Sequence, residues 1–556
     1  MLAFEFKPKF FSLLKEKEIT RKIILKDLLA GTVVGIVALP LAIAFAIASG
    51  VTPEKGLITA IVAGFLISLL GGSRVQIGGP TGAFIVIVYE IVHQYGTEGL
   101  TLATFLAGFI LIGLGILKLG NLLKFISHSL IVGFTTGIAI IIFTSQLKDF
   151  LGLKIQNLPG EFLHKIIVIW ENLHSINYYA LGIGLISISI IIITPKFIKK
   201  IPGSILALLF TTIIVQYFNI PVETIESRFG EISNIIPKPQ FYLIDFKTFI
   251  ELFRPAIAIA LLGAIESLLS AIVADGMIGG NHRPNTELIA QGIANVASSM
   301  FGGIPATGAI ARTATNIKNG GRTPIAGMFH AIVLLMIMWI ASPIAKKIPL
   351  ATLAGILIVV SYNMSELHQF IAILKTNKYE ITLLLSTFLL TVFVDLVIAI
   401  EVGVILSSFI LMIRMSNSLK VEKLFDNNGE QEKKDFEKEL GTIPDNILLY
   451  EINGPFFFGA AQSFAEIIKD SFSNINLPLQ QKHLILILRM RYVPFIDLTG
   501  IQRLKNIIQT LSKKNVMIVF SGVNETVKKE LLQHKVTQEK FIHSHIQSAL
   551  DFAKSL

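Results

Sequence analysis

The chain has 556 residues, of which 53% are hydrophobic and 15% charged, and its mean hydropathy of +0.69 lies outside the range of soluble globular domains. The formal net charge of +10 does not indicate nucleic-acid binding, because the Lys and Arg residues are spread over loops between apolar segments and form no basic stripe with interleaved aromatics. The absence of cysteine excludes disulfides and agrees with a reducing compartment.

Residues 1–26 are expected to form a cytoplasmic lead, because their basic residues precede the first apolar run and no small-residue cleavage site follows. Apolar runs of spanning length then recur, which predicts a transmembrane transport domain over residues 27–415. We expect fourteen segments, near residues 28–50, 55–71, 82–95, 100–118, 129–147, 177–194, 202–218, 253–274, 287–301, 307–318, 324–343, 350–363, 380–394 and 396–413.

Basic loop residues set the expected orientation of these segments. If the N-terminus lies inside, most of them, including Arg74, Arg283 and Lys378, fall on the same side as the N-terminus, as the positive-inside rule requires. The exceptions are Lys148, Lys346 and Lys347. An even number of spans returns the chain to that side, so we expect a multi-pass protein of the plasma membrane with both termini in the cytoplasm.

Two similar motifs indicate an internal repeat, with halves at about residues 27–220 and 251–415. The sequence GGPTGA at residues 78–83 is echoed by GGIPATGA at residues 302–309. An odd number of segments in each half inverts the second half relative to the first. The predicted fold class is a polytopic α-helical membrane protein with two inverted seven-segment repeats. At this offset Pro40 corresponds to Glu266, so their neighbourhoods should face each other across a pseudo-twofold axis.

The C-terminal part has a different composition, which predicts a charged linker over residues 416–440 and a small cytoplasmic α/β domain over residues 441–556. Strands are expected at Ile447–Asn453, Leu484–Met490 and Val516–Gly522 because these runs are continuously apolar. Helices are expected at Ala460–Phe472 and Leu498–Lys513, with two more beginning near Glu525 and His545.

The paired motifs are the strongest candidates for a binding site. Glycine and proline interrupt a helix and leave half-helices that begin inside the membrane, where their N–H groups and positive dipole ends attract an anion. Thr81 and Thr307 would add hydroxyl donors, and Phe45, one turn beyond Pro40, would supply an apolar wall. The remaining candidates in the motifs are Gly82, Ala83 and Gly308. The alternative is that these small residues only allow close helix packing.

Two charged residues inside predicted spans require partners, because a charge in the bilayer is costly. Arg312 is a candidate counter-charge for the substrate; alternatively it reaches the cytoplasmic interface or pairs with a nearby acid. Glu266 is a candidate for binding a coupling proton, or Na⁺ with the help of Ser270; alternatively it makes only a structural hydrogen bond.

Other polar residues are interpreted as structural. Asp395 and Glu401 interrupt the last apolar stretch, and Asp395 is expected to mark the turn between the last two spans. His282, His543 and His545 lack companions at metal-ligand spacing, so no metal site is predicted. There is no phosphate-binding loop ending in Gly-Lys-Ser/Thr and no recognisable enzyme motif, so we expect neither ATP-driven transport, nor a cofactor, nor catalysis.

Four stretches resemble the sulfate permease family of anion transporters, the relatives of prestin and pendrin: VALP at 37–40, GGSRVQIGGPTGA at 71–83, SQLKDFLG at 145–152, and the run from 264 to 327. The resemblance implies a core domain that moves as an elevator against a gate domain, a homodimer, and a C-terminal STAS domain. It also implies a substrate site between spans one, three, eight and ten, at Phe45, Thr81, Glu266, Ala311 and Arg312. Many relatives have Gln directly after the first-span proline, where this chain has Leu41.

In the part similar to a STAS domain, Asp497-Leu498-Thr499-Gly500 resembles the loop that carries the phosphorylated residue of anti-sigma-factor antagonists. Thr499 is therefore a candidate regulatory site, with a cytoplasmic regulatory protein as its partner; alternatively Thr499 is an ordinary helix N-cap. The predicted function is secondary transport of sulfate, bicarbonate or a C4-dicarboxylate by proton- or sodium-coupled symport. Four alternatives stay open: a passive anion channel, an exchanger, a nucleobase symporter and a membrane sensor.

Overall fold

The computed structural model describes residues 6–121, 127–155, 158–197, 202–230, 235, 237–241, 245–417, 420–423, 443–444, 446–457, 464, 466–468 and 484–556. Its contacts divide the chain into two compact units, Met1–Ile405 and Leu406–Leu556. Each unit is described by itself.

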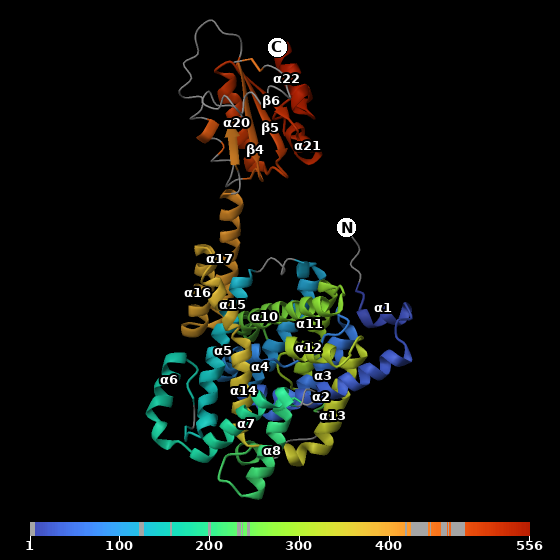
Figure 1. Cartoon of the computed structure of the whole chain (residues 1–556), viewed down its shortest axis with the longest axis vertical. Coiled ribbons are helices and arrows are strands. Elements are labelled where there is room, and N and C mark those ends of the chain that lie inside the picture. Colours follow the sequence, from blue (N-terminus) through green and yellow to red (C-terminus); the bar gives the residue numbers. More distant parts are fainter. Residues whose placement is uncertain are drawn as a thin grey trace. The chain divides into compact units, whose positions relative to one another are not determined.

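The first half of the membrane part contains nine helices among its described residues (Figure 1). They are α1 (Lys9–Lys15), α2 (Arg21–Ala48), α3 (Pro53–Leu70), α4 (Ile85–Ile116), α5 (His128–Leu151), α6 (Phe162–Glu171), α7 (Tyr178–Phe197), α8 (Gly203–Tyr217) and α9 (Ile225–Phe229). The second half contains α10 (Phe246–Ile278), α11 (Pro284–Met300), α12 (Ile310–Lys318), α13 (Ile325–Ala345), α14 (Leu350–Met364), α15 (Leu367–Ile373), α16 (Lys378–Phe393) and α17 (Leu396–Asn417).

Each of the fourteen predicted segments coincides with a helix. Within the described ranges, eight helices are long and apolar enough to cross a membrane by length and composition. The predicted spans 82–95 and 100–118 form the two parts of α4, which bends at Gly96, where φ is +69°. The helix α12 has only 9 residues. At 1.5 Å per residue it extends about 14 Å, roughly half of the hydrocarbon core, so it is a half-helix as the motif predicted.

The helices of the membrane part pack in two groups, each drawn from both halves of the sequence. One group consists of α2, α3, α4 and α10 to α13, and the other contains α5, α7, α8, α14 and α16 (Figure 1). Small residues allow the first group to pack closely: Gly108 on α4 and Gly292 on α11 face each other, so that a Cβ on either would press on the other's carbonyl oxygen. These groups correspond to the core and gate that the family resemblance implied.

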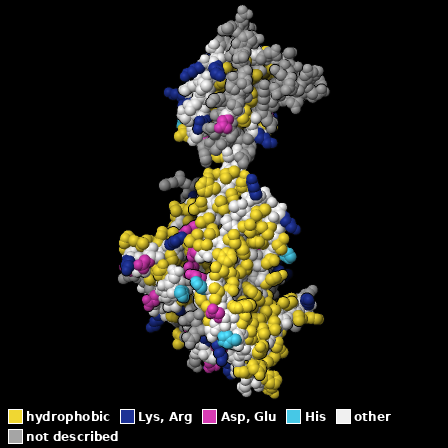
Figure 2. Space-filling view, turned by 90° about the vertical axis from the view of Figure 1, so that its left-hand side faces the viewer, with side chains coloured by type: hydrophobic (Ala, Val, Ile, Leu, Met, Phe, Trp, Pro, Cys, Tyr) yellow, Lys and Arg dark blue, Asp and Glu magenta, His cyan; other side chains and the backbone are white. Residues whose placement is uncertain are grey.

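Hydrophobic side chains cover most of the surface of the membrane part on the face shown in Figure 2. Large residues such as Leu29, Ile213 and Trp339 are more than half exposed on their helices. A soluble protein does not leave so much apolar area in water, whereas lipid accepts it. The surface therefore agrees with the membrane environment that the composition required.

Four short helices, α1, α6, α9 and α15, were not predicted as elements. The amphipathic helix α6 buries Lys165 and Ile169 and leaves Leu163 and Trp170 exposed. Its 10 residues are too few to span the bilayer. The sequence pattern missed it because the run is short and its buried face carries a lysine.

The C-terminal unit contains a five-stranded sheet in the order β3-β4-β5-β6-β7. The strands are β3 (Lys420–Lys423), β4 (Ile447–Asn453), β5 (Leu484–Tyr492), β6 (Val516–Ser521) and β7 (Ile542–His543). Only β3 is antiparallel to its neighbour. The helices α20 (Leu498–Ser512), α21 (Glu525–Gln533) and α22 (Ile546–Ser555) follow β5, β6 and β7. Two apolar clusters, one around Leu504 and one around Ala549, show that both faces of the sheet are covered.

The three predicted strands and the helix from Leu498 are confirmed, and the last helix begins at Ile546, one residue after the predicted His545. The expected linker over residues 416–440 requires a correction, because β3 lies inside it and pairs with β4. The sequence pattern missed this strand because most of its residues are charged. Charged residues are common in strands that lie, like β3, at the edge of a sheet. Residues 424–440 and most of the helix expected at Ala460–Phe472 lie outside the described residues.

Candidate functional site

The two predicted motifs meet in the structure through a short antiparallel pair of strands. In this pair, β1 (Gly78–Gly79) aligns Gly78 with Gly308 and Gly79 with Thr307 of β2 (Thr307–Gly308). The Ala309 N–H also donates to the Ile77 carbonyl at 2.8 Å. A helix begins directly after each strand: a 3₁₀ turn at Gly82–Phe84 leads into α4, and α12 begins at Ile310. The starts of the two half-helices are therefore held side by side.

Glu266 of α10 is tied to the first motif by a hydrogen bond. The Thr81 hydroxyl donates to Glu266 Oε2 at 2.8 Å, across 185 positions of sequence. Glu266 thus lies at the start of the first half-helix. The neighbouring hydroxyl, that of Ser270, is buried one turn further along α10 and bonds with the Thr313 hydroxyl at 3.2 Å. Ser270 therefore contacts α12 instead of Glu266.

Arg312 lies in the interior, where its side chain joins the second motif to the first. Its Nη2 donates to the Pro80 carbonyl, the residue before Thr81, and its Nη1 lies against Gly79. Arg312 is only 2% exposed, so the predicted alternative that it reaches the interface is wrong. In the described part of the chain, Arg312 has no carboxylate within ion-pair distance, and Nη1 has no hydrogen-bond partner. Glu266 nevertheless interacts electrostatically with Arg312, without a direct ion pair.

The other predicted substrate residues differ in how far they are exposed to solvent. Phe45 and Ala83 are each 5% exposed and belong to the main apolar cluster. A Cβ on Gly82 would contact Phe45 and the sulfur of Met364, which shows that α14 of the second group also borders the site. Sequence reasoning missed Met364, because nothing local distinguishes this methionine from other core residues. Ala311, by contrast, is exposed.

Thr307 and Gly308 serve the framework of the site. The Thr307 hydroxyl donates to the Gly263 carbonyl on α10 at 2.7 Å, so its O–H already has an acceptor. Gly308 lies against the Gln76 side chain, whose Nε2 donates to Ser267 Oγ at 3.0 Å. No Cβ fits at Gly308 without moving that side chain. The two halves of the repeat are thus not chemically equivalent at the site, although their backbones are related.

A buried carboxylate that the sequence did not single out supports the loop before β1. Glu287 on α11 is fully buried, and its Oε2 accepts the N–H groups of Gly72 at 2.8 Å and Ser73 at 3.2 Å. Its Oε1 accepts from Ser267 at 3.1 Å and Gln291 at 2.8 Å. Four donors satisfy this carboxylate, so its role is to position the chain leading to the first motif.

Several residues interpreted as structural do have structural partners. Asp395 lies in the turn between α16 and α17, as predicted, and accepts the Ile398 N–H at 2.8 Å. Glu401 forms an ion pair with Arg254 at 2.9 Å. His282 contacts Asp275 at 2.7 Å. The described residues contain no cluster of three or more His, Asp or Glu side chains with metal-binding geometry.

Thr499 is not the cap of its helix, which corrects one predicted alternative. The N-cap of α20 is Asp497, whose Oδ1 accepts the Gly500 N–H at 2.7 Å. Thr499 is the second residue of the helix and its side chain is exposed.

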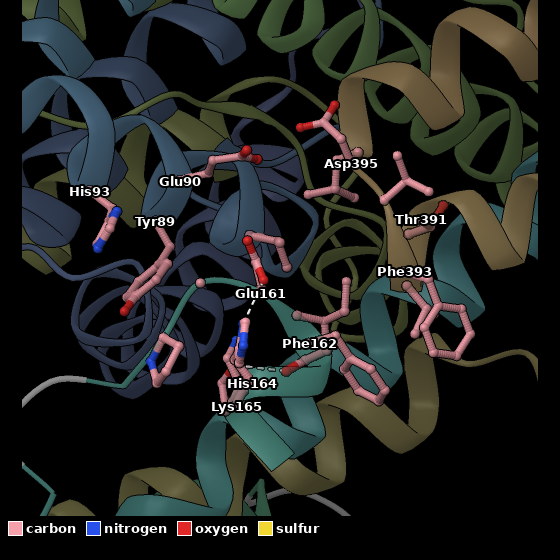
Figure 3. A pocket seen from close by; sticks show the side chains of 18 of the residues that line it. Tyr89, Glu90, His93, Glu161, Phe162, His164, Lys165, Thr391, Phe393 and Asp395 are labelled. Carbon is pink, nitrogen blue, oxygen red and sulfur yellow. Dashed lines mark hydrogen bonds and ion pairs between the residues drawn. The ribbon is translucent and has the colours of Figure 1, made fainter. Parts of the chain in front are cut away.

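A cavity of about 760 Å³, which we call the vestibule, lies among helices of the membrane part (Figure 3). Its walls come from the first part of α4, from α5 and α6, and from the turn between α16 and α17. It reaches Ile85, the residue after the Gly82–Phe84 turn, and Ala48, one turn beyond Phe45. Glu90 and Asp395 both line this cavity (Figure 3).

Comparisons with known proteins agree with this architecture. Residues 24–387 match the profile of the Sulfate permease family, and residues 441–551 match that of the STAS domain. The chain is 41% identical to YvdB of Bacillus subtilis (strain 168), provisionally named a sulfate transporter, over 94% of this chain and 96% of YvdB. It is 34% identical to the bicarbonate transporter BicA of a Picosynechococcus species, over 81% of this chain and 82% of BicA.

Two solved structures share the fold. The transmembrane domain of a cyanobacterium BicA aligns with a TM-score of 0.63 and 32% identity, covering 69% of this chain and 98% of that chain. The overall structure of SLC26A9 aligns with a TM-score of 0.84 and 20% identity, covering 98% of this chain and 92% of that chain. The relatives named above are transporters, which confirms the prediction that the chain is not an enzyme.

Proposed function

Since the chain belongs to the sulfate permease family of anion transporters, we propose that it carries a small oxyanion, sulfate or bicarbonate, by symport with H⁺ or Na⁺ across the plasma membrane. The observation that carries this proposal is the β1–β2 pair, which holds two half-helix starts together with Glu266 and the buried Arg312. The names of YvdB and BicA favour the two oxyanions. A C4-dicarboxylate offers the same charge and acceptor oxygens and is a further candidate.

Anion binding follows from the charges at the two half-helix starts. Each helix N-terminus presents N–H groups without intrahelical acceptors and the equivalent of about half a positive charge. Arg312 adds a full positive charge, and its Nη1 has no partner within the described ranges. An oxyanion at Thr81 would supply acceptor oxygens and negative charge together. Phe45 and Ala83 keep the neighbourhood dry, which strengthens these attractions.

Coupling to a cation follows from the carboxyl group of Glu266. An ionised carboxylate beside a bound anion repels it, and the repulsion is strong where water is excluded. A proton on Glu266, or a Na⁺ ion bound to it, would remove this repulsion, so the anion and the cation would enter together. The Thr81 hydroxyl links the two sites, because it donates to Glu266 at the start of the half-helix where the anion is proposed to bind.

The division of the helices into two packing groups indicates how the site would move. The candidate residues Thr81, Glu266 and Arg312 all lie on the core group, α2 to α4 and α10 to α13, whereas Met364 belongs to the gate group. A rigid shift of the core along the gate would expose the same site to either side of the membrane, which is the elevator motion that we propose. We further propose that the chain is a homodimer with both termini in the cytoplasm, and that Thr499 is a site where a regulatory protein acts.

Flux measurements on the full-length protein in liposomes test the proposal. Uptake of radiolabelled sulfate and bicarbonate is followed with an imposed proton gradient, a sodium gradient, or neither, and with C4-dicarboxylates as competitors. Symport predicts accumulation above electrochemical equilibrium with one of the gradients. Uptake that never exceeds equilibrium identifies a channel, and dependence on an internal anion identifies an exchanger. Competition by uracil would identify a nucleobase carrier, and a membrane sensor would give no flux.

A further inference from the structure

The side chain of Lys165 on α6 is a buried cation in the wall of the vestibule (Figure 3). Lys165 is 3% exposed, and its Nζ donates to the Ser145 hydroxyl on α5 at 2.9 Å. Nζ also lies 5.7 Å from the centre of the Tyr89 ring on α4. Across the described parts of the chain, no carboxylate lies within 4.0 Å of this nitrogen. Three helices therefore converge on a positive charge that has no ionic partner.

A buried ammonium group of this kind lacks a counter-charge. It carries three N–H donors, and the neutral Ser145 hydroxyl accepts only one of them. Burial lowers the pKa of Lys165 to about 8, so the group is still mostly protonated at neutral pH. A buried cation is costly unless a negative group compensates it. An anion in the vestibule would provide both the missing charge and acceptors for the remaining donors.

The acidic groups of the same cavity are engaged elsewhere. Glu161 pairs with His164 at 2.7 Å, Glu90 accepts from Gln94 Nε2 at 3.3 Å, and Asp395 accepts the Ile398 N–H at 2.8 Å. In Figure 3, Glu90 and Asp395 lie apart from Lys165 on the far side of the cavity. The titratable groups around the vestibule are Tyr89, Glu90 and His93 on α4, Glu161 and His164 at the start of α6, Asp395 after α16, and Lys148, one turn beyond Ser145 on α5.

We propose that Lys165 Nζ and Ser145 Oγ form a second anion-binding subsite, which captures a small inorganic oxyanion in the vestibule before it reaches Thr81 and Arg312. The inference rests on the proposed function for the identity of the anion. The same cavity extends to Ile85 and Ala48, so an anion released from Lys165 would move toward the half-helix starts within one continuous space. The subsite would raise the local substrate concentration and would take no part in the coupling step.

The subsite is tested by replacing Lys165 with Met, which keeps most of the length of the side chain and removes the charge. Losing one charge-assisted hydrogen bond should raise the KM for sulfate or bicarbonate uptake about tenfold. The maximal rate should stay within about twofold, because Arg312 and Glu266 are untouched. Ser145→Ala should have a smaller effect in the same direction. The control is Lys154→Met, which removes an exposed cation from the segment after α5 and should leave KM unchanged.

A binding measurement separates the subsite from the transport hypothesis. Equilibrium dialysis of radiolabelled sulfate against the full-length protein in detergent should give two sites per chain. Lys165→Met should lose one of them and Arg312→Met the other. Sulfate binding at the Lys165 site should weaken as the pH rises above about 8, because the protonated amine is the binding form.

The outcomes are distinct. Unchanged KM and unchanged stoichiometry in Lys165→Met would overturn the subsite, even if the wild-type protein transports sulfate. Conversely, a protein that shows no flux but loses one sulfate site in Lys165→Met would refute the proposed transport while keeping the subsite. If Lys165→Met is poorly folded, Ser145→Ala and the pH dependence of the wild-type protein decide the question.

Discussion

Replacing Arg312 by Met is the sharpest test of how the site holds its anion. The guanidinium is 2% exposed and donates to the carbonyl of Pro80, the residue before Thr81. Consecutive Cα atoms are about 3.8 Å apart, so an anion at the start of the half-helix would lie on the order of 6 Å from the guanidinium. With an effective dielectric constant of about 20, Coulomb's law gives about 2.8 kcal/mol for each unit of anion charge at that distance.

This energy corresponds to roughly a 100-fold rise in KM for bicarbonate, with a larger rise for divalent sulfate. The comparison of the two anions is the decisive measurement, because a packing defect would affect both alike, whereas a lost charge affects the divalent anion more. Uptake into liposomes is measured over a range of anion concentrations, and the melting temperature confirms folding. The matched control is Lys318→Met, which removes an exposed cation from the end of the same helix. Equal KM values in Arg312→Met and the wild-type protein would refute the counter-charge role.

Three further predictions follow from single contacts. Glu266→Gln should abolish gradient-driven accumulation while preserving anion counterflow, because Gln still accepts from Thr81 but cannot carry the coupling charge; unchanged accumulation would remove Glu266 from the mechanism. Gly79→Ala should destabilise the protein by about 1–3 kcal/mol, since φ is +148° and a Cβ would press on the Arg312 guanidinium; a thermal melt equal to that of the wild type would contradict this reasoning. Asp497→Ala should weaken the amide-exchange protection at the start of α20 by about 1 kcal/mol, whereas Thr499→Ala should not, because Asp497 is the cap. Equal effects of the two changes would show that the capping assignment is wrong.

Much of the fold could be predicted because hydrophobic length and periodicity are local properties of the chain. The strands at Ile447–Asn453 and Val516–Gly522 follow from continuous apolar runs, and the half-helix α12 follows from the Gly- and Pro-containing motif before it. Among the elements that were missed, α6 is short and β3 is strongly charged. Their positions depend on distant partners, since α6 covers Ser145 of α5 and β3 pairs with β4.

The sequence by itself determined that the chain spans a membrane, repeats its architecture and carries two related motifs, because these properties depend on which residues are neighbours along the chain. It also singled out Glu266 and Arg312, because charges are rare inside apolar segments. Only the tertiary structure decided what these groups contact. Thr81 donates a hydrogen bond to Glu266 across 185 positions, Arg312 donates one to the Pro80 carbonyl, and the Ser270 hydroxyl bonds with the Thr313 hydroxyl. The physical reason is that side-chain direction and long-range packing are fixed by the whole fold, and no local pattern encodes them.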